Sequence, residues 1–371
     1  MTTHMFKPDL PPPSISVGPL AWVRANLFSG WFNTLLTLLG LYVLWLAIPP
    51  LIEWAFIHAY WGSGTRADCV PQGEGAAKGA CWIFIGDRFG QFMYGFYPTE
   101  LRWRVDLAGI LAVVAAIPLF LDRFQYKAKY GLAYLVIYPV VAYWLLHGGF
   151  FGLETVATSQ WGGLMLTIVI AAVGIAGALP LGILLALGRR SELPAIKVIC
   201  VTFIEFWRGV PLITVLFMSS VMLPLFLPEG ISLDKLMRAM VMVVFFEAAY
   251  IAEVVRGGMQ AIPKGQYEAA AAMGLGYWRT MGLVILPQAL KLVIPGIVNT
   301  FIALFKDTSL VIIIGLFDLL NSIKRATSDP MWLGMSTEGY VFAALVYWIF
   351  CFSMSRYSMR LERKLNTGHT R

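Results

Sequence analysis

Long runs of apolar residues, separated by short polar segments, make up most of this chain. A transmembrane helix needs about 20 consecutive, predominantly apolar residues. Eight stretches approach this requirement: 31–52, 105–121, 130–146, 161–187, 204–227, 237–255, 281–305 and 339–355. The second is the weakest because its charge-free part is short and contains Pro118. The pattern predicts an all-α fold, a polytopic membrane helix bundle with about eight transmembrane helices.

Lysine and arginine gather in alternate loops. They follow the second, fourth and sixth stretches and recur in the tail, whereas residues 148–160 carry none. Because basic loops tend to remain in the cytoplasm, we expect both termini inside. Residues 1–28 are then a cytoplasmic N-terminal segment and residues 359–371 a cytoplasmic tail. The loop at 58–104 is expected outside.

The external loop contains Cys69 and Cys81. In an oxidising periplasm this pair could form a disulfide, and the alternative is two free thiols in a mobile loop. Cys200 and Cys351 lie near the ends of apolar stretches and are expected to be lone thiols.

The composition excludes several classes of function. With 58% hydrophobic and 13% charged residues, the chain is not an ordinary cytosolic enzyme. Its net charge of +7 reflects cytoplasmic loops rather than nucleic-acid binding. The sequence has no GxxxxGK[ST], HExxH or GxSxG motif, so we expect no catalytic residues, no metal site and no ATP hydrolysis by this chain alone.

The stretch after residue 255, RGGMQAIPKGQYEAAAAMGLGYWRTMGLVILPQAL, is too polar to span a membrane. It predicts two short helices separated by a turn at Gly274 and Gly276. Small residues after Glu268 would let a partner approach closely. We therefore expect a helix parallel to the membrane that docks into a cytosolic partner, and the alternative is an interfacial helix without such a partner.

This stretch resembles the inner-membrane permeases of ATP-binding-cassette (ABC) importers. Their signature is EAA, three residues, Gly, nine residues and an Ile-x-Leu-Pro end, and only the Ile position departs, to Val284. The residues that match are Glu268, Ala269, Ala270, Gly274, Leu286 and Pro287. The resemblance implies a type I ABC importer permease core, a five-helix unit at 156–358, with three additional transmembrane helices at 29–155. It also implies that ATP and Mg belong to a partner ATPase and that this chain holds no cofactor.

Three further segments resemble the polar-amino-acid branch of these permeases: EFWRGVPL at 205–212, AAYIAEVVRGG at 248–258 and KDTSL at 306–310. The additional helices are similar to the larger permease subunits of general L-amino-acid importers. The resemblance implies a bacterial inner-membrane subunit that carries amino acids, in a range of polar L-amino acids, delivered by a periplasmic binding protein. Two ATPase subunits and a second permease would complete the assembly, with a heterodimer favoured.

Ionisable side chains inside a membrane cost about 2.5 to 3.5 kcal/mol each at mid-helix, so each should face protein or water. A self-contained secondary transporter, using paired charges such as Glu247 and Lys291, is one alternative function, and an integral-membrane enzyme is another. Near the cytosolic helix ends we expect a set of structural charges that brace the coupling loop rather than contact substrate: Glu205, Arg208, Glu253, Arg256 and Lys291.

Glu247 lies deeper and either faces the pore or is a paired structural glutamate. The run Lys306, Asp307, Thr308 and Ser309 offers an acceptor for an ammonium group and donors for a carboxylate, as a zwitterionic amino acid requires. These five residues are the candidate substrate pathway. For the run, the alternative is a helix cap in which Asp307 or Ser309 accepts hydrogen bonds from backbone amides.

Overall fold

The computed structural model describes residues 18–70, 77–121, 123–149, 151–226, 228 and 233–365. Most of the expected N-terminal segment at 1–28, and the end of the expected tail at 359–371, lie outside these residues. The chain divides into two compact units, Met1–Ile83 and Phe84–Arg371. Both are helical, as the apolar pattern predicts.

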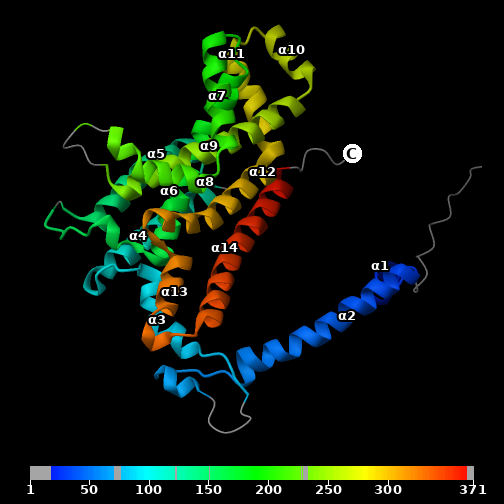
Figure 1. The fold of residues 1–371 in the computed structure, drawn as a ribbon. Coiled ribbons are helices and arrows are strands. Elements are labelled where there is room, and N and C mark those ends of the chain that lie inside the picture. Colours follow the sequence, from blue (N-terminus) through cyan, green and yellow to red (C-terminus); the bar gives the residue numbers. More distant parts are fainter. Residues whose placement is uncertain are drawn as a thin grey trace, which may run out of the picture. The chain divides into compact units, whose positions relative to one another are not determined.

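The first unit contains α1 (Pro19–Asn26) and α2 (Trp31–Ile52), drawn in blue in Figure 1. The bounds of α2 coincide with the first predicted span. The helix continues into a π-helical turn, η1 (Glu53–Ile57), and a short 3₁₀ helix follows, η2 (Arg66–Cys69).

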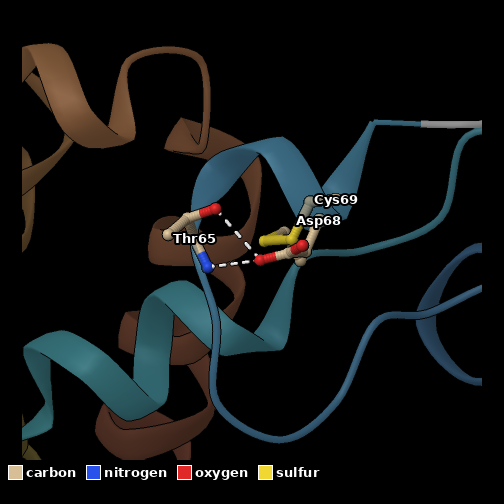
Figure 2. Close-up of a disulfide and its surroundings, with 4 residues drawn as sticks. Thr65, Asp68 and Cys69 are labelled. Carbon is tan, nitrogen blue, oxygen red and sulfur yellow. Dashed lines mark hydrogen bonds between the residues drawn. A yellow bond between two sulfur atoms is a disulfide. The ribbon is translucent and has the colours of Figure 1, made fainter.

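A disulfide joins Cys69 to Cys81 and closes a hairpin after α2. Figure 2 shows the Asp68 carboxylate beside it, accepting hydrogen bonds from the Thr65 backbone amide at 2.7 Å and the Thr65 hydroxyl at 3.0 Å. The backbone bond and then the hydroxyl bond hold the pKa of Asp68 below its usual value. The Trp82 indole donates to the Ala55 carbonyl at 2.8 Å, so the hairpin is also tied to the end of the helix before it.

The second unit contains nearly all of the remaining helices. The α-helices are α3 (Trp82–Tyr94), which starts at the end of the first unit, α4 (Arg102–Phe120), α5 (Lys127–His147), α6 (Gly163–Arg189), α7 (Pro194–Gly209), α8 (Leu212–Val221), α9 (Lys235–Ala261), α10 (Lys264–Ala272), α11 (Tyr277–Arg279), α12 (Leu286–Asp307), α13 (Leu319–Thr327) and α14 (Ser336–Leu365). The shorter elements are η3 (Thr99–Leu101), η4 (Thr158–Gln160), η5 (Leu223–Phe226), η6 (Thr280–Ile285), η7 (Thr308–Ile314), η8 (Pro330–Trp332) and a two-residue strand, β1 (Phe317–Asp318).

Six helical segments of the described chain are long and apolar enough to cross a membrane: Trp31–Ile57, Thr99–Phe120, Lys129–His147, Gly163–Arg189, Tyr277–Ile314 and Ser336–Leu365. The bent pair α7 and α8 raises the number to seven if it is one span. These segments confirm a polytopic helix bundle. The remaining predicted span falls in α9, which is not among them because Arg238, Glu247, Glu253 and Arg256 lie along it.

The apolar stretch predicted as a span at 204–227 is not one continuous helix. The chain instead bends by 101° between α7 and α8. Pro211 has no amide hydrogen, and it disfavours helical geometry at the residue before it. Val210 is accordingly extended, with φ −112° and ψ 133°. The short α8 ends where the buried Arg238 guanidinium donates to the carbonyls of Ser219 at 3.1 Å and Ser220 at 2.9 Å.

The core of the second unit lies where α9 packs against α6, α7, α8 and α12. Glycines on α6 allow the close approach of α9. A Cβ atom added to Gly182 would stand 2.6 Å from Ile251 Cγ2 and 2.9 Å from the Ala248 carbonyl oxygen. In Figure 1, α10 and α11 lie at one end of this unit and α13 lies at the other.

We predict that Gly182→Val destabilises the protein, because the valine side chain would overlap Ile251 and the α9 backbone. Overpacking of this kind costs about 1 to 3 kcal/mol. Thermal unfolding of the purified protein in detergent measures the loss. Gly257→Val is the matched control, since no atom stands within 4 Å of a Cβ at that helical position. Equal transition temperatures for the two variants would contradict the packing role of Gly182.

Candidate functional site

The polar stretch after α9 folds as the short helix α10, which ends in a glycine turn. Gly274 adopts a left-handed backbone conformation, with φ +72°. The Leu275 amide donates to the Ala270 carbonyl at 3.1 Å, and the Gly274 amide donates to the Ala271 carbonyl at 2.9 Å. This pair of bonds is the Schellman motif, which satisfies the last carbonyls of a helix and favours glycine at the left-handed position. The spacing between the EAA residues and the glycine is therefore explained by the structure: the EAA residues lie in α10, and Gly274 ends that helix.

One side of α10 faces the protein and the other is exposed. Ala270 is buried, whereas Glu268 and Ala269 are exposed. Leu286 and Pro287 begin α12, where Leu286 is half-buried and Pro287 is exposed.

Tyr267 fixes α10 against two longer helices. Its hydroxyl donates to the Met259 carbonyl of α9 at 3.1 Å and accepts from the Arg190 guanidinium, just after α6, at 2.9 Å. Large apolar side chains nearby are exposed, with Met273 at 80% and Trp278 at 72%. Together α10 and the turn after it present a firmly held surface of small and apolar residues.

Beside α10, the structure brings together four of the five expected structural charges around Glu253. Its carboxylate lies 2.8 Å from Arg256, 3.0 Å from Arg189 and 3.9 Å from Arg208. Arg189 also pairs with Glu205 at 2.7 Å. We call these residues the Glu253 cluster: Arg189, Glu205, Arg208, Glu253 and Arg256.

The sequence analysis included both Glu253 and Arg256, which pair three residues apart on one helix, but not Arg189, which comes from α6. Lys291 takes part in none of the ion pairs found in the described part of the chain. Its predicted place among the bracing charges therefore has no partner to support it.

Residues 306–309 lie where α12 passes into η7. Lys306 is exposed, Asp307 and Ser309 are half-buried, and Thr308 is buried. The hydroxyl of Thr308 donates to the Phe305 carbonyl at 2.8 Å, and that of Ser309 donates to the Lys306 carbonyl at 2.9 Å. Asp307 accepts no capping hydrogen bond, so the helix-cap alternative lacks this interaction.

Glu247 is buried in α9, with 2% of its surface exposed. No ion pair or hydrogen bond of the Glu247 side chain is found within the described ranges. The two acidic members of the candidate substrate pathway, Glu247 and Asp307, lie on α9 and α12, two helices that pack against each other.

A buried polar group that sequence reasoning missed lies after η7. Asp318 is fully buried and is the N-cap of α13, where the amides of Leu320 and Asn321 donate to its carboxylate. The Tyr347 hydroxyl of α14 also donates to it, at 2.9 Å. The available signal was an Asp followed by Asn three residues later inside an apolar region. In the described part of the chain, including the surroundings of Asp318, no group of three or more His, Cys, Asp or Glu residues could hold a metal ion.

Comparison with known proteins identifies relatives along the whole chain. A family described as "Binding-protein-dependent transport system inner membrane component" matches residues 178–367. The chain is 64% identical, over 98% of its length and 97% of the relative's, to "Inner membrane amino-acid ABC transporter permease protein YhdY" of Escherichia coli (strain K12). It is 41% identical, over 99% of its length and 98% of the relative's, to "Glutamate/glutamine/aspartate/asparagine transport system permease protein BztC" of Rhodobacter capsulatus.

Among solved structures, the chain is similar to one described as "Crystal structure of an amino acid ABC transporter with histidines", with 28% identity and a TM-score of 0.48. The match covers 54% of this chain and 92% of that one.

We predict that Glu253→Gln destabilises the protein more than Glu205→Gln does. Glu253 is the common partner of three arginines and has a side chain only 15% exposed, whereas Glu205 is 53% exposed and contacts Arg189. Loss of the central carboxylate leaves the arginines to repel one another and should cost about 1 to 3 kcal/mol. Thermal unfolding in detergent at low and high salt checks this. Equal losses in the two variants would contradict the central role of Glu253.

Proposed function

The chain belongs to the family of binding-protein-dependent transport system inner membrane components, and from this premise we propose that it forms part of a translocation pathway for polar L-amino acids. It is the permease subunit of an ABC importer and not an enzyme, because ATP hydrolysis in this family resides on a separate subunit. The observation that carries the proposal is α10, an exposed EAA helix closed by the Gly274 turn and held by Tyr267.

Polar amino acids are the proposed cargo because of the relatives that match nearly the whole chain. One is named as an amino-acid permease, and the other is named for glutamate, glutamine, aspartate and asparagine. Neither a self-contained secondary transporter nor an integral-membrane enzyme finds support in these comparisons. The secondary-transporter alternative used Lys291, which joins no ion pair in the described residues.

The family implies ATPase and binding-protein partners. We propose a complete importer of two permease subunits, two ATPase subunits that hold ATP and Mg, and a periplasmic amino-acid-binding protein. A heterodimer of permeases is favoured because α2, α4 and α5 precede the region that matches the family, and such additions suit a specialised member of a pair.

The protein is a multi-pass inner-membrane protein. We propose that both termini and α10 face the cytoplasm, as the Lys and Arg distribution predicts. A disulfide between Cys69 and Cys81 supports an oxidising, external location for the hairpin after α2.

The proposed cargo pathway runs past Glu247 and residues 306–309. Asp307 and Glu247 would accept hydrogen bonds from the ammonium group of the amino acid, while Lys306 would donate to its carboxylate. The hydroxyls of Thr308 and Ser309, whose hydrogens donate to the carbonyls of Phe305 and Lys306, would offer further acceptors. Each contact is expected to be weak, since a tightly bound substrate could not leave the site. The packing of α9, which carries the buried Glu247, against α12, which ends at Asp307, supports this assignment.

The coupling role of α10 predicts a difference between two neighbouring glycines. Gly274→Val should be costly because a left-handed backbone strains an L-residue by about 1 to 2 kcal/mol. Gly276→Val is the matched control, because Gly276 has φ −69° and open space around it. We expect Gly274→Val, and separately Glu268→Lys on the exposed face, to reduce ATPase co-purification and ATP-driven uptake in proteoliposomes. Wild-type uptake in both would remove the coupling role.

The pathway assignment predicts that Asp307→Asn and Thr308→Val impair uptake while the complex still assembles. Loss of one partner of a buried polar contact costs about 1 to 3 kcal/mol, or roughly a 5- to 150-fold reduction. Uptake and substrate-stimulated ATPase activity of the assembled importer are the measurements. Glu192→Gln, at an exposed position after α6, serves as the control. Wild-type activity in both pathway variants would contradict the assignment.

A further inference from the structure

The buried carboxylate of Asp318 is surrounded by hydrogen-bond donors from two helices. The backbone amides of Leu320 and Asn321 lie 3.2 Å and 3.1 Å from its oxygens, and the Tyr347 hydroxyl lies at 2.9 Å. The Asn321 side-chain amide also donates to it. None of these donors carries a charge, so the stability of the buried carboxylate depends on the number of donors and on where they are placed. Moving α13 relative to α14 would break the Tyr347 bond, the one of these four bonds that joins the two helices.

Asn321 connects this carboxylate to the proposed pathway. Its side-chain nitrogen donates to the Ser309 backbone carbonyl at 2.8 Å as well as to Asp318. A side-chain amide nitrogen has two hydrogens, and here each has an acceptor. Because the Asp318 carboxylate can only accept, it fixes the amide with its nitrogen, not its oxygen, toward Ser309. Asp318 therefore orients the Asn321 side chain, and the oriented amide binds the Ser309 carbonyl.

The same region is attached to the start of α6. The Leu319 amide donates to the Thr167 hydroxyl at 3.0 Å, and the Gly163 amide donates to the Ser322 hydroxyl at 3.1 Å. The Tyr347 ring packs edge-on against Phe305, just before residues 306–309, with ring centroids 5.5 Å apart. Two independent contacts, one polar and one aromatic, thus hold the two sides of the 306–309 segment to a frame built from α6, α13 and α14.

We propose that Asp318, Asn321 and Tyr347 form an outer latch that positions residues 306–309 for substrate passage. This inference rests on the proposed pathway function of that segment. The latch makes the Ser309 carbonyl follow α13 and α14, so that the pathway residues change position only when these two helices move with them. The three residues act through the segment and do not themselves contact the amino acid.

The test uses the assembled importer in proteoliposomes with its binding protein. Tyr347→Phe removes only the hydroxyl and keeps the ring against Phe305, while Asn321→Leu removes both donors at similar volume. Tyr340→Phe, at an exposed position on the same helix, is the matched control. The readouts are uptake per ATP hydrolysed, the KM and kcat of uptake, and the amount of assembled complex.

We expect Tyr347→Phe to lower uptake per ATP hydrolysed by 5-fold or more, with the loss in kcat rather than KM and with assembly unchanged. Asn321→Leu should have a larger effect, and Tyr340→Phe should match the wild type. If the three residues had a purely structural role, Tyr347→Phe would lower the amount of complex and leave uptake per ATP hydrolysed unchanged. That result would overturn the proposed latch, whether or not the Asn321→Leu complex assembles. Absence of binding-protein-dependent uptake in the wild-type complex would instead contradict the proposed function itself.

Discussion

The contact between α6 and α9 is the interaction on which the rest of the second unit depends. α9 carries Glu247 and Glu253, and charged groups inside a membrane must face protein or water. The glycines of α6, Gly182 among them, bring the two backbones close enough to bury the small and β-branched residues of α9 between them. α7, α8 and α12 then pack around α9. The helix that carries charged residues along its length thus lies at the centre of the unit.

The Glu253 cluster and α10 are neighbours along α9, and this arrangement joins the surface that α10 presents to the core. α9 passes directly into α10 through Ile262 and Pro263, so there is little slack between them. The Tyr267 hydroxyl is hydrogen-bonded to α9 and to Arg190. Arg189, the residue before Arg190, pairs with Glu253 of α9. A force on α10 therefore reaches α6 and α9 together through short, directional contacts.

Local features were predictable from the sequence, and long-range ones were not. The bounds of α2 follow from the hydropathy of its own residues. The end of α10 follows from the ability of glycine to adopt a left-handed backbone, which is a property of Gly274 alone. The break before α8 was missed because an average over an apolar stretch ignores the effect of Pro211, which interrupts the helix. The Arg189–Glu253 pair and the Asn321–Ser309 bond join different helices, and only the folded arrangement decides which partner each residue meets.

Arg238 changes the electrostatics at the end of α8. The carbonyl end of a helix carries a partial negative charge that can attract a cation. Here the guanidinium already binds the carbonyls of Ser219 and Ser220. The guanidinium therefore offsets the partial negative charge at the end of α8, and α8 packs against η7, which carries Thr308 and Ser309. In the proposed pathway, selection by charge would fall to side chains, which evolution can change one at a time without rebuilding the backbone.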